Sequence, residues 1–523
     1  MAYKQFLNEI QSKYSLASDR IEELNGNEIY IHVKPDDFFN YCFALHEELP
    51  STVMALFAKE EGSIFRIYCS FIGIKLKKWF WVTIDIAKDH PHFNSIAKKI
   101  YSANLFEREI REMFGIESIG NPDIRRLHLH EEVWPSGAYP LRKDFIAPKT
   151  IKGSGEYEFT KVEGEGIFEV PVGPVHAGII GPGHFRFSVA GEPIINLEIR
   201  LGFTHRGIEK LMENKLPAEA LLLAECTAGD AAFSHSLAFC QAIERICKIS
   251  VPDRSEKIRA LFLELERMYN HVADIGGIAL DVGFSQPAAL ASIIKESIQQ
   301  LNDKLTGNRF LKGVNCIGGI NKDINFDQEK IIIDTLALVR HDFETLKKML
   351  LSSVSFLDRV DTTGVLKKKT AEDFGVLGPA GRASGIDQDL RADFPGIYAD
   401  LAFKKLILGS GDVLARLNIR IHEFEQADNL ICEILTKLPI NKKLTFIPEK
   451  CPAGFALGYV ESWRGSVLYW ININHDGKID RCKIVDPSFR NWQGLAYAVY
   501  ENIIPDFPVC NKSFNLSYAG NDL

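Results

Sequence analysis

A glycine-rich, charged stretch divides the sequence into a short first part and a long second part. Residues 149–169 contain Lys-Gly-Ser-Gly-Glu and Glu-Gly-Glu-Gly and have almost no apolar periodicity, which is typical of a flexible connection. A chain of 523 residues is long enough for two or more domains. We therefore predict a small domain at 1–148, a linker at 149–169 and a larger domain at 170–523.

The first domain has the pattern of a small α+β unit. Three runs rich in aromatic and β-branched residues, at 52–59, 63–71 and 77–86, follow one another with turn signals between them. This pattern predicts an antiparallel sheet. Helical patterns lie at 36–48 and 94–113, and the second is followed by a glycine, as is usual where a helix ends.

The second domain has long helical patterns. Apolar residues at spacings of three and four run from Ile258 to Ile275 and are followed by Gly276-Gly277, which predicts the end of that helix. Further helical patterns cover 287–305 and 327–357. Together these segments predict a helical bundle at the centre of the domain.

Two hairpins are predicted at the periphery of this bundle. Apolar and polar residues alternate over 185–201 on both sides of a turn, and again over 467–485. The second alternation is interrupted by Asp476-Gly477, a dipeptide that favours a type I′ turn. The predicted fold class of the whole chain is α+β.

The composition excludes several classes of protein. The chain has 61 basic and 69 acidic residues, a net charge of −8 and no long basic tract, so nucleic acid is not expected as a partner. No segment has the apolar length of a spanning helix, and the first residues lack the apolar core of a signal peptide. We therefore expect a cytoplasmic location.

No cofactor is expected to bind to this chain through a common motif. Its 10 cysteines are scattered, and no two have the C-x-x-C spacing of zinc, iron-sulfur and dithiol sites, so most are expected to be buried thiols. Neither G-x-G-x-x-G after a strand nor a phosphate-binding loop occurs. NAD is therefore expected, if at all, as a substrate of a larger complex and not as a ligand of this chain.

Dense motifs in both domains identify a family. The first domain contains Glu-Arg-Glu-Ile-Arg-Glu-Met-Phe-Gly at 107–115 and Tyr-Pro-Leu-Arg-Lys-Asp at 139–144; the second contains Gly-Pro-Val-His at 173–176 and Thr-His-Arg-Gly-Ile-Glu-Lys at 204–210. They resemble the 30 kDa-type and 49 kDa-type subunit families of complex I, and the 49 kDa-type family shares its ancestry with nickel-iron hydrogenase large subunits. The resemblance covers the whole chain and implies a hydrogenase large-subunit-like second domain.

The metal-ligand positions of the hydrogenases separate the branches of this superfamily. In the register set by Glu225 and His235, the first pair of family cysteines falls on Ala228 and Ala231, and the second pair falls on Ser517 and Gly520. Soft thiolates are the ligands that suit nickel. The resemblance is therefore to the hydrogenase-related group, like hydrogenase-4 component G, that lacks these cysteines, and we expect no nickel.

The resemblance also implies candidate catalytic residues. In the complex I family, the histidine of G-P-x-H binds the quinone head group and pairs with an aspartate; here these are His176 and Asp281. Such a carboxylate would orient the imidazole for proton transfer. The family's quinone-binding tyrosine is replaced by Gly229, and the adjacent Asp230 could carry a proton instead. Arg464 matches an arginine that hydrogenases place over the metals.

Each of these residues also has a purely structural interpretation. His176 and Asp281 could be inherited scaffold, Asp230 a solvated loop carboxylate, and Arg464 the partner of a carboxylate. His205, Arg206, Glu209 and Lys210 belong to the family edge that faces the iron-sulfur subunit, although an exposed helix start is the alternative.

The resemblance implies a peripheral subunit on the cytoplasmic side of the cell membrane. Its expected partners are a small subunit with a 4Fe-4S cluster, a ferredoxin-like subunit and antiporter-like membrane subunits. Such a chain would be an electron-transfer subunit of an ion-translocating oxidoreductase. The alternatives are a quinone-reducing NADH:quinone oxidoreductase subunit and a non-catalytic scaffold that joins the iron-sulfur arm to the membrane subunits.

Overall fold

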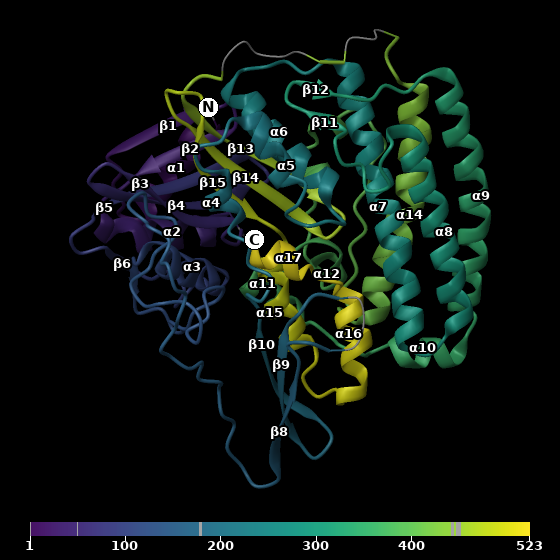
Figure 1. The fold of residues 1–523 in the computed structure, drawn as a ribbon, viewed down its shortest axis with the longest axis horizontal. Helices are drawn as coiled ribbons and strands as arrows, with labels where there is room; N and C mark the ends of the chain where they lie inside the picture. The colour runs from purple at the N-terminus through teal and green to yellow at the C-terminus, as the bar shows by residue number, and fades with distance from the viewer. Residues whose placement is uncertain (1, 50, 177–179, 441–443, 446–450) are drawn as a thin grey trace.

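The computed structural model describes residues 2–49, 51–176, 180–440, 444–445 and 451–523. Three layers lie side by side in Figure 1: the N-terminal sheet, a central sheet of β13, β14 and β15, and a bundle of long helices. A further sheet of β8, β9 and β10 projects from one end (Figure 1). The predicted α+β class is confirmed. Among the described residues, no helix is both long and apolar enough to cross a bilayer.

The N-terminal sheet has the strand order β1-β2-β5-β4-β3. Its strands are β1 (Arg20–Leu24), β2 (Glu28–His32), β3 (Ala55–Glu61), β4 (Ile64–Gly73) and β5 (Lys78–Ala87). The predicted antiparallel meander of β3, β4 and β5 is confirmed. The sheet is nevertheless mixed, because β2 pairs with β5 in parallel. A crossover through helix α2 (Phe38–Glu48) separates β2 from the meander and permits this direction.

The helix predicted over 94–113 is shorter than expected. Helix α3 covers Asn104–Phe114 and ends at Gly115, whose φ of 69° is that of a left-handed C-terminal cap. The residues before it form a turn, because the buried Glu107 carboxylate accepts hydrogen bonds from the backbone N–H groups of Ile96 (2.8 Å) and Ala97 (3.3 Å). A side chain thus replaces the helical hydrogen bonds of this segment.

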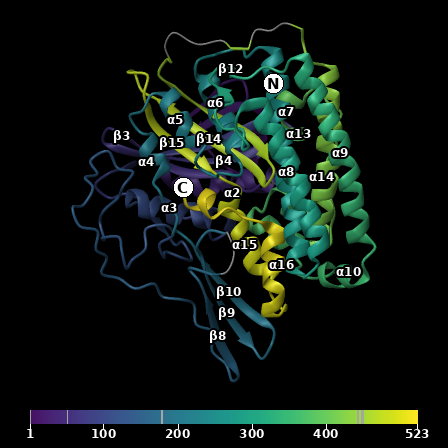
Figure 2. The ribbon, with the colours of Figure 1, turned by 45° about the vertical axis from the view of Figure 1, so that its right-hand side comes forward.

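The helical bundle consists of α7 (Asp253–Asp281), α8 (Ser285–Thr306), α9 (Phe326–Leu351) and α14 (Val413–Thr436). These helices run side by side in both ribbon views (Figures 1 and 2). The predicted end of α7 at Gly276-Gly277 is wrong. A Cβ on Gly276 would lie 2.6 Å from the Ala291 Cβ atom of α8, so this glycine permits close helix packing inside α7.

The helical pattern over 327–357 is divided between two helices. Helix α9 ends at Leu351, and α10 (Val354–Val360) begins after Ser353, whose side chain accepts a hydrogen bond from the Phe356 N–H group. Such an N-cap favours a new start over a continuous helix.

Both predicted hairpins are present and each belongs to a three-stranded sheet. The first sheet consists of β8 (Ile167–Val172), β9 (His184–Ala190) and β10 (Ile194–Arg200); the central sheet consists of β13 (Gly454–Ser462), β14 (Gly465–Ile473) and β15 (Ile479–Val485). The predicted type I′ turn is wrong. Gly477 has a φ of 80°, but Asp476 is not among the residues with positive φ, which a type I′ turn requires at both positions.

The central sheet is buried on both faces. On β14, Val467, Tyr469 and Ile471 belong to the core shared with the helices, whereas Leu468 and Trp470 belong to the core of the N-terminal sheet. The Trp470 ring lies 4.9 Å from those of Phe57 and Tyr68. The strand therefore places alternate side chains in two cores. The predicted domain boundaries stay a prediction, and β8 begins inside the predicted linker, at Ile167.

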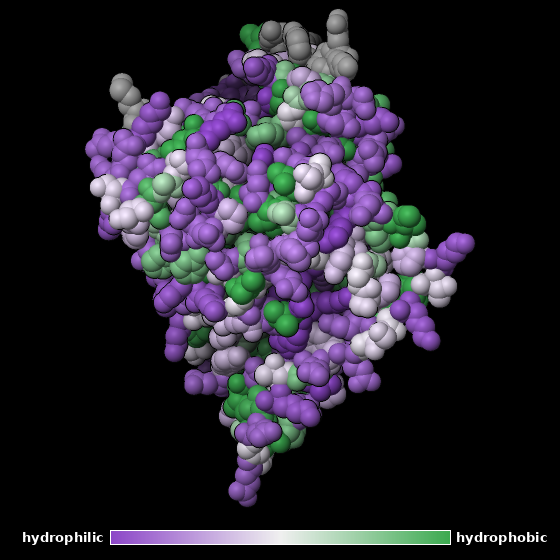
Figure 3. All heavy atoms as spheres, turned by 90° about the vertical axis from the view of Figure 1, so that its left-hand side faces the viewer, coloured by the Kyte–Doolittle hydropathy of each residue, from purple (hydrophilic) through white to green (hydrophobic). Residues whose placement is uncertain are grey.

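Short helices connect the layers. They are α1 (Ala2–Tyr14), α4 (Ile208–Met212), α5 (Pro217–Ala224), α6 (Ala232–Ile246), α11 (Lys368–Phe374), α12 (Gly378–Ala383), α13 (Leu390–Asp393), α15 (Ser488–Ala498), α16 (Phe507–Phe514) and α17 (Tyr518–Asp522). Of these, α6 packs across β13 and β14. The face of the N-terminal domain in Figure 3 is mainly hydrophilic, with apolar side chains in small groups.

Candidate functional site

The structure brings together the two segments that carry the predicted metal-ligand positions. Two arginine side chains join residues 226–235, before and at the start of α6, to residues 515–520. The Arg206 guanidinium donates to the backbone oxygens of Thr227 and Ala519, both at 2.9 Å. Arg464 donates to the Asn515 oxygen (2.5 Å) and also binds Asp230. Thus residues nearly 300 positions apart in the sequence line one site.

An apolar cluster occupies the first pair of predicted ligand positions. Ala228, Ala231 and the indole of Trp463 are buried against one another. At the second pair, a Cβ on Gly520 would lie only 2.6 Å from the Asp486 Oδ2 atom. Neither pair offers a thiolate, and among the described residues no group of three His, Cys, Asp or Glu side chains could hold a metal ion. These residues do not fit a nickel centre.

Arg464 and Asp230 form a two-point ion pair beside this cluster. The Nη1–Oδ1 distance is 2.7 Å and the Nη2–Oδ2 distance is 2.6 Å. The guanidinium also lies 3.9 Å above the Trp463 ring. Burial lowers the pKa of Arg464, but the Asp230 carboxylate more than offsets this and raises the pKa above its usual value. Two residues predicted separately therefore form one unit. Arg464 is paired with a carboxylate, and its predicted catalytic role stays a prediction.

A buried hydrogen-bond chain leads away from this site. His235 bridges Asp486 (Nε2–Oδ2, 3.1 Å) and the Tyr469 hydroxyl (Nδ1–Oη, 3.0 Å), and Tyr469 reaches the Thr227 hydroxyl at 3.1 Å. All four side chains are buried. Burial raises the pKa of Asp486, but His235 and Arg464 more than offset this and bring the pKa below its usual value. This series of hydrogen bonds can hold or relay a proton between groups that water does not reach.

Sequence reasoning missed Tyr469 and Asp486 as parts of the site. Tyr469 stands in an alternating strand, so its pattern indicates only a core position. Asp486 follows strand β15, and its position at a strand end was a usable signal.

A second buried network surrounds the strand that leads to Trp463 and Arg464. Its carboxylates are Glu264, Asp389, Glu423 and Glu461, and its guanidiniums are those of Arg267, Arg382 and Arg391. His271 also contacts Glu423, and burial lowers its pKa to about 4, which leaves it neutral. Burial, followed by the nearby Asp389, raises the pKa of Glu461 to about 7, although the surrounding arginines act in the opposite direction.

His176 and Asp281 lie on different elements, and their predicted pairing stays a prediction. The His176 ring lies 5.6 Å from the Phe185 ring and 6.5 Å from that of Tyr518, which stands between the second pair of ligand positions. Asp281 ends α7. Burial raises its pKa, and the positive charge of Lys512 partly offsets this. Residues 177–179, directly after His176, lie outside the described residues.

The four residues of the predicted partner surface differ in accessibility. Arg206 is exposed, whereas His205 and Lys210 are partly buried. Glu209 is not part of this surface, contrary to the prediction, because its buried carboxylate binds Arg481 (2.6 Å) and Lys483 (3.2 Å) inside the chain. Burial raises the pKa of Glu209, but these cations lower it to about 2. The expected exposed helix start is likewise wrong for Glu209.

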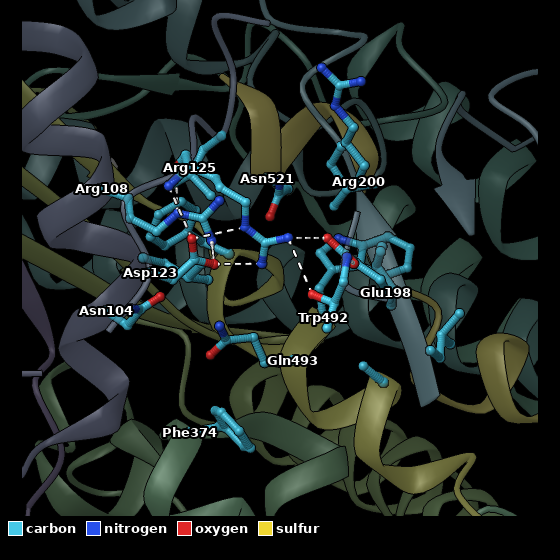
Figure 4. Close-up of a pocket in the computed structure, with 18 of the residues that line it drawn as sticks. Asn104, Arg108, Asp123, Arg125, Glu198, Arg200, Phe374, Trp492, Gln493 and Asn521 are labelled. Atoms are coloured by element: carbon cyan, nitrogen blue, oxygen red, sulfur yellow. Dashed lines mark hydrogen bonds and ion pairs between the residues drawn. The ribbon is translucent and has the colours of Figure 1, made fainter. Parts of the chain in front are cut away.

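A cavity of about 500 Å³ lies beyond α17, between the N-terminal domain, β10 and α15 (Figure 4). Its arginines are already engaged. Arg125 binds Asp123 (2.8 Å) and Glu198 (2.5 Å), and Arg108 binds Asp123 (3.0 Å). Asn521 of α17 also lines the cavity, so this short helix separates it from the Gly520 side of the site.

Comparisons with known proteins match two separate regions of the chain to two subunit families. Residues 31–150 match the family described as respiratory-chain NADH dehydrogenase, 30 Kd subunit, and residues 281–451 match the corresponding 49 Kd subunit. Formate hydrogenlyase subunit 5 of Escherichia coli is 33% identical over 485 residues, which are 89% of this chain and 84% of that protein. The chain belongs to this family of fused 30 kDa/49 kDa-type subunits.

A second curated protein and a solved structure are also similar to this chain, over different shares of its length. Hydrogenase-4 component G of Escherichia coli is 30% identical over 507 residues, 94% of this chain and 87% of that protein. A chain of the membrane-bound sulfane sulfur reductase, an archaeal respiratory membrane complex, superposes with a TM-score of 0.65 and 25% identity. The match covers 69% of this chain and 99% of that chain. The names of these relatives thus include hydrogenases and a sulfane sulfur reductase, and the site residues have to distinguish between such activities.

Proposed function

We propose that this chain is the pocket-forming large subunit of a membrane-bound, ion-translocating oxidoreductase of the complex I-like and hydrogenase-related type, and that it is not itself a nickel hydrogenase. The observation that carries the proposal is the packing of Trp463 against Ala228 and Ala231. An indole and two methyl groups take the place where the family's metal-binding branch has thiolates. The family membership supports the type of complex.

In the proposed function, this chain moves protons and its partners move electrons. Asp230 has an open end, since 40% of its side chain is exposed, and its other side is fixed by the buried Arg464. A carboxylate in this position can exchange a proton with solvent and deliver it to a substrate at the site. The guanidinium holds the carboxylate in place and can stabilise negative charge on a substrate oxygen or sulfur.

The electrons would come from a 4Fe-4S cluster of a small partner subunit, supplied by a ferredoxin-like subunit. We place the small subunit at the edge marked by the exposed Arg206, and antiporter-like subunits in the membrane. The chain would then lie on the cytoplasmic side. His176 and Asp281 are proposed as a second proton-donating unit, with a quinone as one candidate acceptor and NADH as one candidate donor of the whole complex.

The test is the purified, intact complex. We expect elemental analysis to find much less than one nickel per large subunit, and a screen of electron donors and acceptors to find an activity that Asp230→Asn lowers. The separately folded chain should show neither flavin nor iron-sulfur absorbance. About one nickel per chain together with hydrogen evolution would overturn the proposal and restore the hydrogenase assignment.

A scaffold without catalysis is the second candidate. The Trp463 indole packs against Ala228 and Ala231, and Arg464 and Asp230 bind each other, so these side chains also have a purely structural role. The two functions differ in their response to mutation. A scaffold subunit would keep the wild-type turnover of the complex in Asp230→Asn, His176→Ala and Asp281→Asn alike.

A further inference from the structure

Two cysteines from distant parts of the sequence meet at the end of α6. Cys247 directly follows this helix, and Cys451 precedes strand β13. Their Sγ atoms are 2.9 Å apart although 204 residues separate them. We propose that Cys247 and Cys451 are a redox modification site, at which a low-molecular-weight disulfide such as oxidised glutathione converts the two thiols into an intramolecular disulfide. This inference does not depend on the proposed function.

The surrounding structure holds the two thiols close together. Near the end of α6, Arg245 donates to the Leu457 oxygen of β13, and the Tyr459 N–H group donates to the Gln241 side chain at 3.3 Å. These contacts tie the helix to the strand next to the cysteine pair. A disulfide bond is about 2.05 Å long, so the sulfur atoms need to approach by less than about 1 Å. The disulfide can therefore form while α6 stays packed against β13.

The two thiols are accessible and differ in reactivity. Both are only partly buried, unlike Cys42, Cys69, Cys240, Cys482 and Cys510, which are buried. The contact with Cys451 lowers the pKa of Cys247, whereas the same contact and burial raise the pKa of Cys451. Because the thiolate is the reactive form, Cys247 is the attacking residue and Cys451 the resolving residue.

The chemistry balances with one equivalent of oxidised glutathione. The Cys247 thiolate attacks one sulfur of the small disulfide, forms a mixed disulfide and releases one glutathione thiolate. Cys451 then loses its proton, attacks the Cys247 sulfur and releases the second glutathione. Two electrons pass from the protein thiols to the small disulfide, which is reduced to two thiols. Excess reduced glutathione reverses both steps.

The bond would connect the two elements that position the candidate site. Helix α6 carries His235, and β13 leads to the turn with Trp463 and Arg464. Oxidation would therefore fix α6 against β13 without touching either the ion pair or the buried hydrogen-bond chain.

The experiment uses the full chain, treated with oxidised glutathione or with dithiothreitol and then alkylated. We expect oxidation to remove the alkylatable thiols of Cys247 and Cys451, and mass spectrometry after non-reducing digestion to find one peptide pair joined through these two residues. The exposed Cys226 is followed on its own peptide. Dithiothreitol should restore both thiols. Cys451→Ser should instead stop at a glutathione adduct on Cys247, whereas the matched variant Cys432→Ser, which changes another partly buried thiol, should form the cross-link normally.

Two outcomes would overturn the proposal. One is full alkylation of both residues after treatment with oxidised glutathione at a large excess over reduced glutathione. The other is a stable glutathione adduct on wild-type Cys247 with Cys451 still free, which would show that the resolving step does not occur. Both are read on the wild-type chain, so neither depends on whether a variant folds.

Discussion

Arg464 holds Asp230 through two hydrogen bonds, one to each carboxylate oxygen, yet the two residues differ in exposure. The arginine is 5% exposed and the aspartate side chain 40%. The pair therefore has a fixed, buried end and an end open to solvent. This arrangement orients the carboxylate more strictly than a surface ion pair would, because the guanidinium fork is rigid and water does not compete for it.

Asp230→Asn should lower the turnover of the assembled complex about 10²- to 10⁴-fold, the range of a lost general acid or base. Arg464→Lys should also lower turnover, because a lysine keeps the charge and loses the two-point geometry. Turnover and its pH profile are the measurements. Glu296→Gln is the control, since Glu296 pairs with Arg309 on the surface, and it should be neutral. Wild-type rates in both site variants would exclude proton transfer by this pair.

Trp463→Ala should destabilise the chain by about 3–5 kcal/mol, as expected when a large buried aromatic side chain leaves a cavity. The substitution also removes a hydrogen bond from the indole Nε1 to the Asp230 backbone oxygen, 3.1 Å long. Denaturant unfolding measures the effect. Phe326→Ala removes an exposed ring as the control. A loss below about 1 kcal/mol would show that Trp463 does not fill this space tightly.

The stability of the chain should fall as the pH rises from 6.5 to 9, in part because of His128. Burial lowers the pKa of this histidine, but its bond to Glu112 (2.9 Å) more than offsets this and raises the pKa from 6.5 to about 9. The imidazolium therefore stabilises the fold fully below pH 6.5 and loses this effect as the pH approaches 9. In His128→Gln the fall should be smaller by about 1–3 kcal/mol.

Other charged groups act on His128, and the comparison has to keep them constant. They are Glu109, Glu112, His205 and Asp522. Measuring the free energy of unfolding of the variant and the wild type at matched pH isolates the contribution of His128. If the free energy of unfolding of His128→Gln ran parallel to that of the wild type between pH 6.5 and 9, the stabilising role of the His128 imidazolium would be contradicted.

Glu461 should cause a similar fall in stability at lower pH. Its folded-state pKa of about 7 lies above the usual 4.5, so the folded chain holds a proton that the unfolded chain has already lost. Glu461 should therefore lower the free energy of unfolding by about 1–3 kcal/mol as the pH rises from 4.5 to 7, and Glu461→Gln should make the fall smaller by this amount. The buried Glu266, whose pKa is raised to about 8, contributes to the fall in the wild type and the variant alike. Infrared difference spectra should also show a protonated carboxyl band that disappears near pH 7. A band unchanged by the substitution would assign the proton to another carboxyl group.

Local sequence signals predicted the local structure well. The antiparallel strands β3 to β5, the glycine cap after α3 and the hairpin of β9 and β10 all follow from neighbouring residues. The errors arise where residues that are distant in the sequence determine the local structure. Gly276 lies inside α7 because Ala291 of another helix approaches it, and the segment before α3 is not helical because Glu107 binds its backbone.

The candidate site was only partly predictable for the same reason. The sequence indicated Asp230 and Arg464 one at a time through motifs, but 234 residues separate them and no local pattern shows that they pair. Glu209 has the residue type of a surface charge at a helix start, and only the fold shows that Arg481 and Lys483 lie beneath it.

The two-residue turn between β13 and β14 couples two parts of the candidate site. Ser462 pairs with Gly465, so Trp463 and Arg464 alone form the turn. Trp463 packs against Ala228 and Ala231, and Arg464 holds Asp230. A larger side chain at Ala228 or Ala231 would have to displace the indole, and a displaced indole would move the arginine next to it in the turn. These two alanines therefore cannot change in size independently of the ion pair on the other side of the turn.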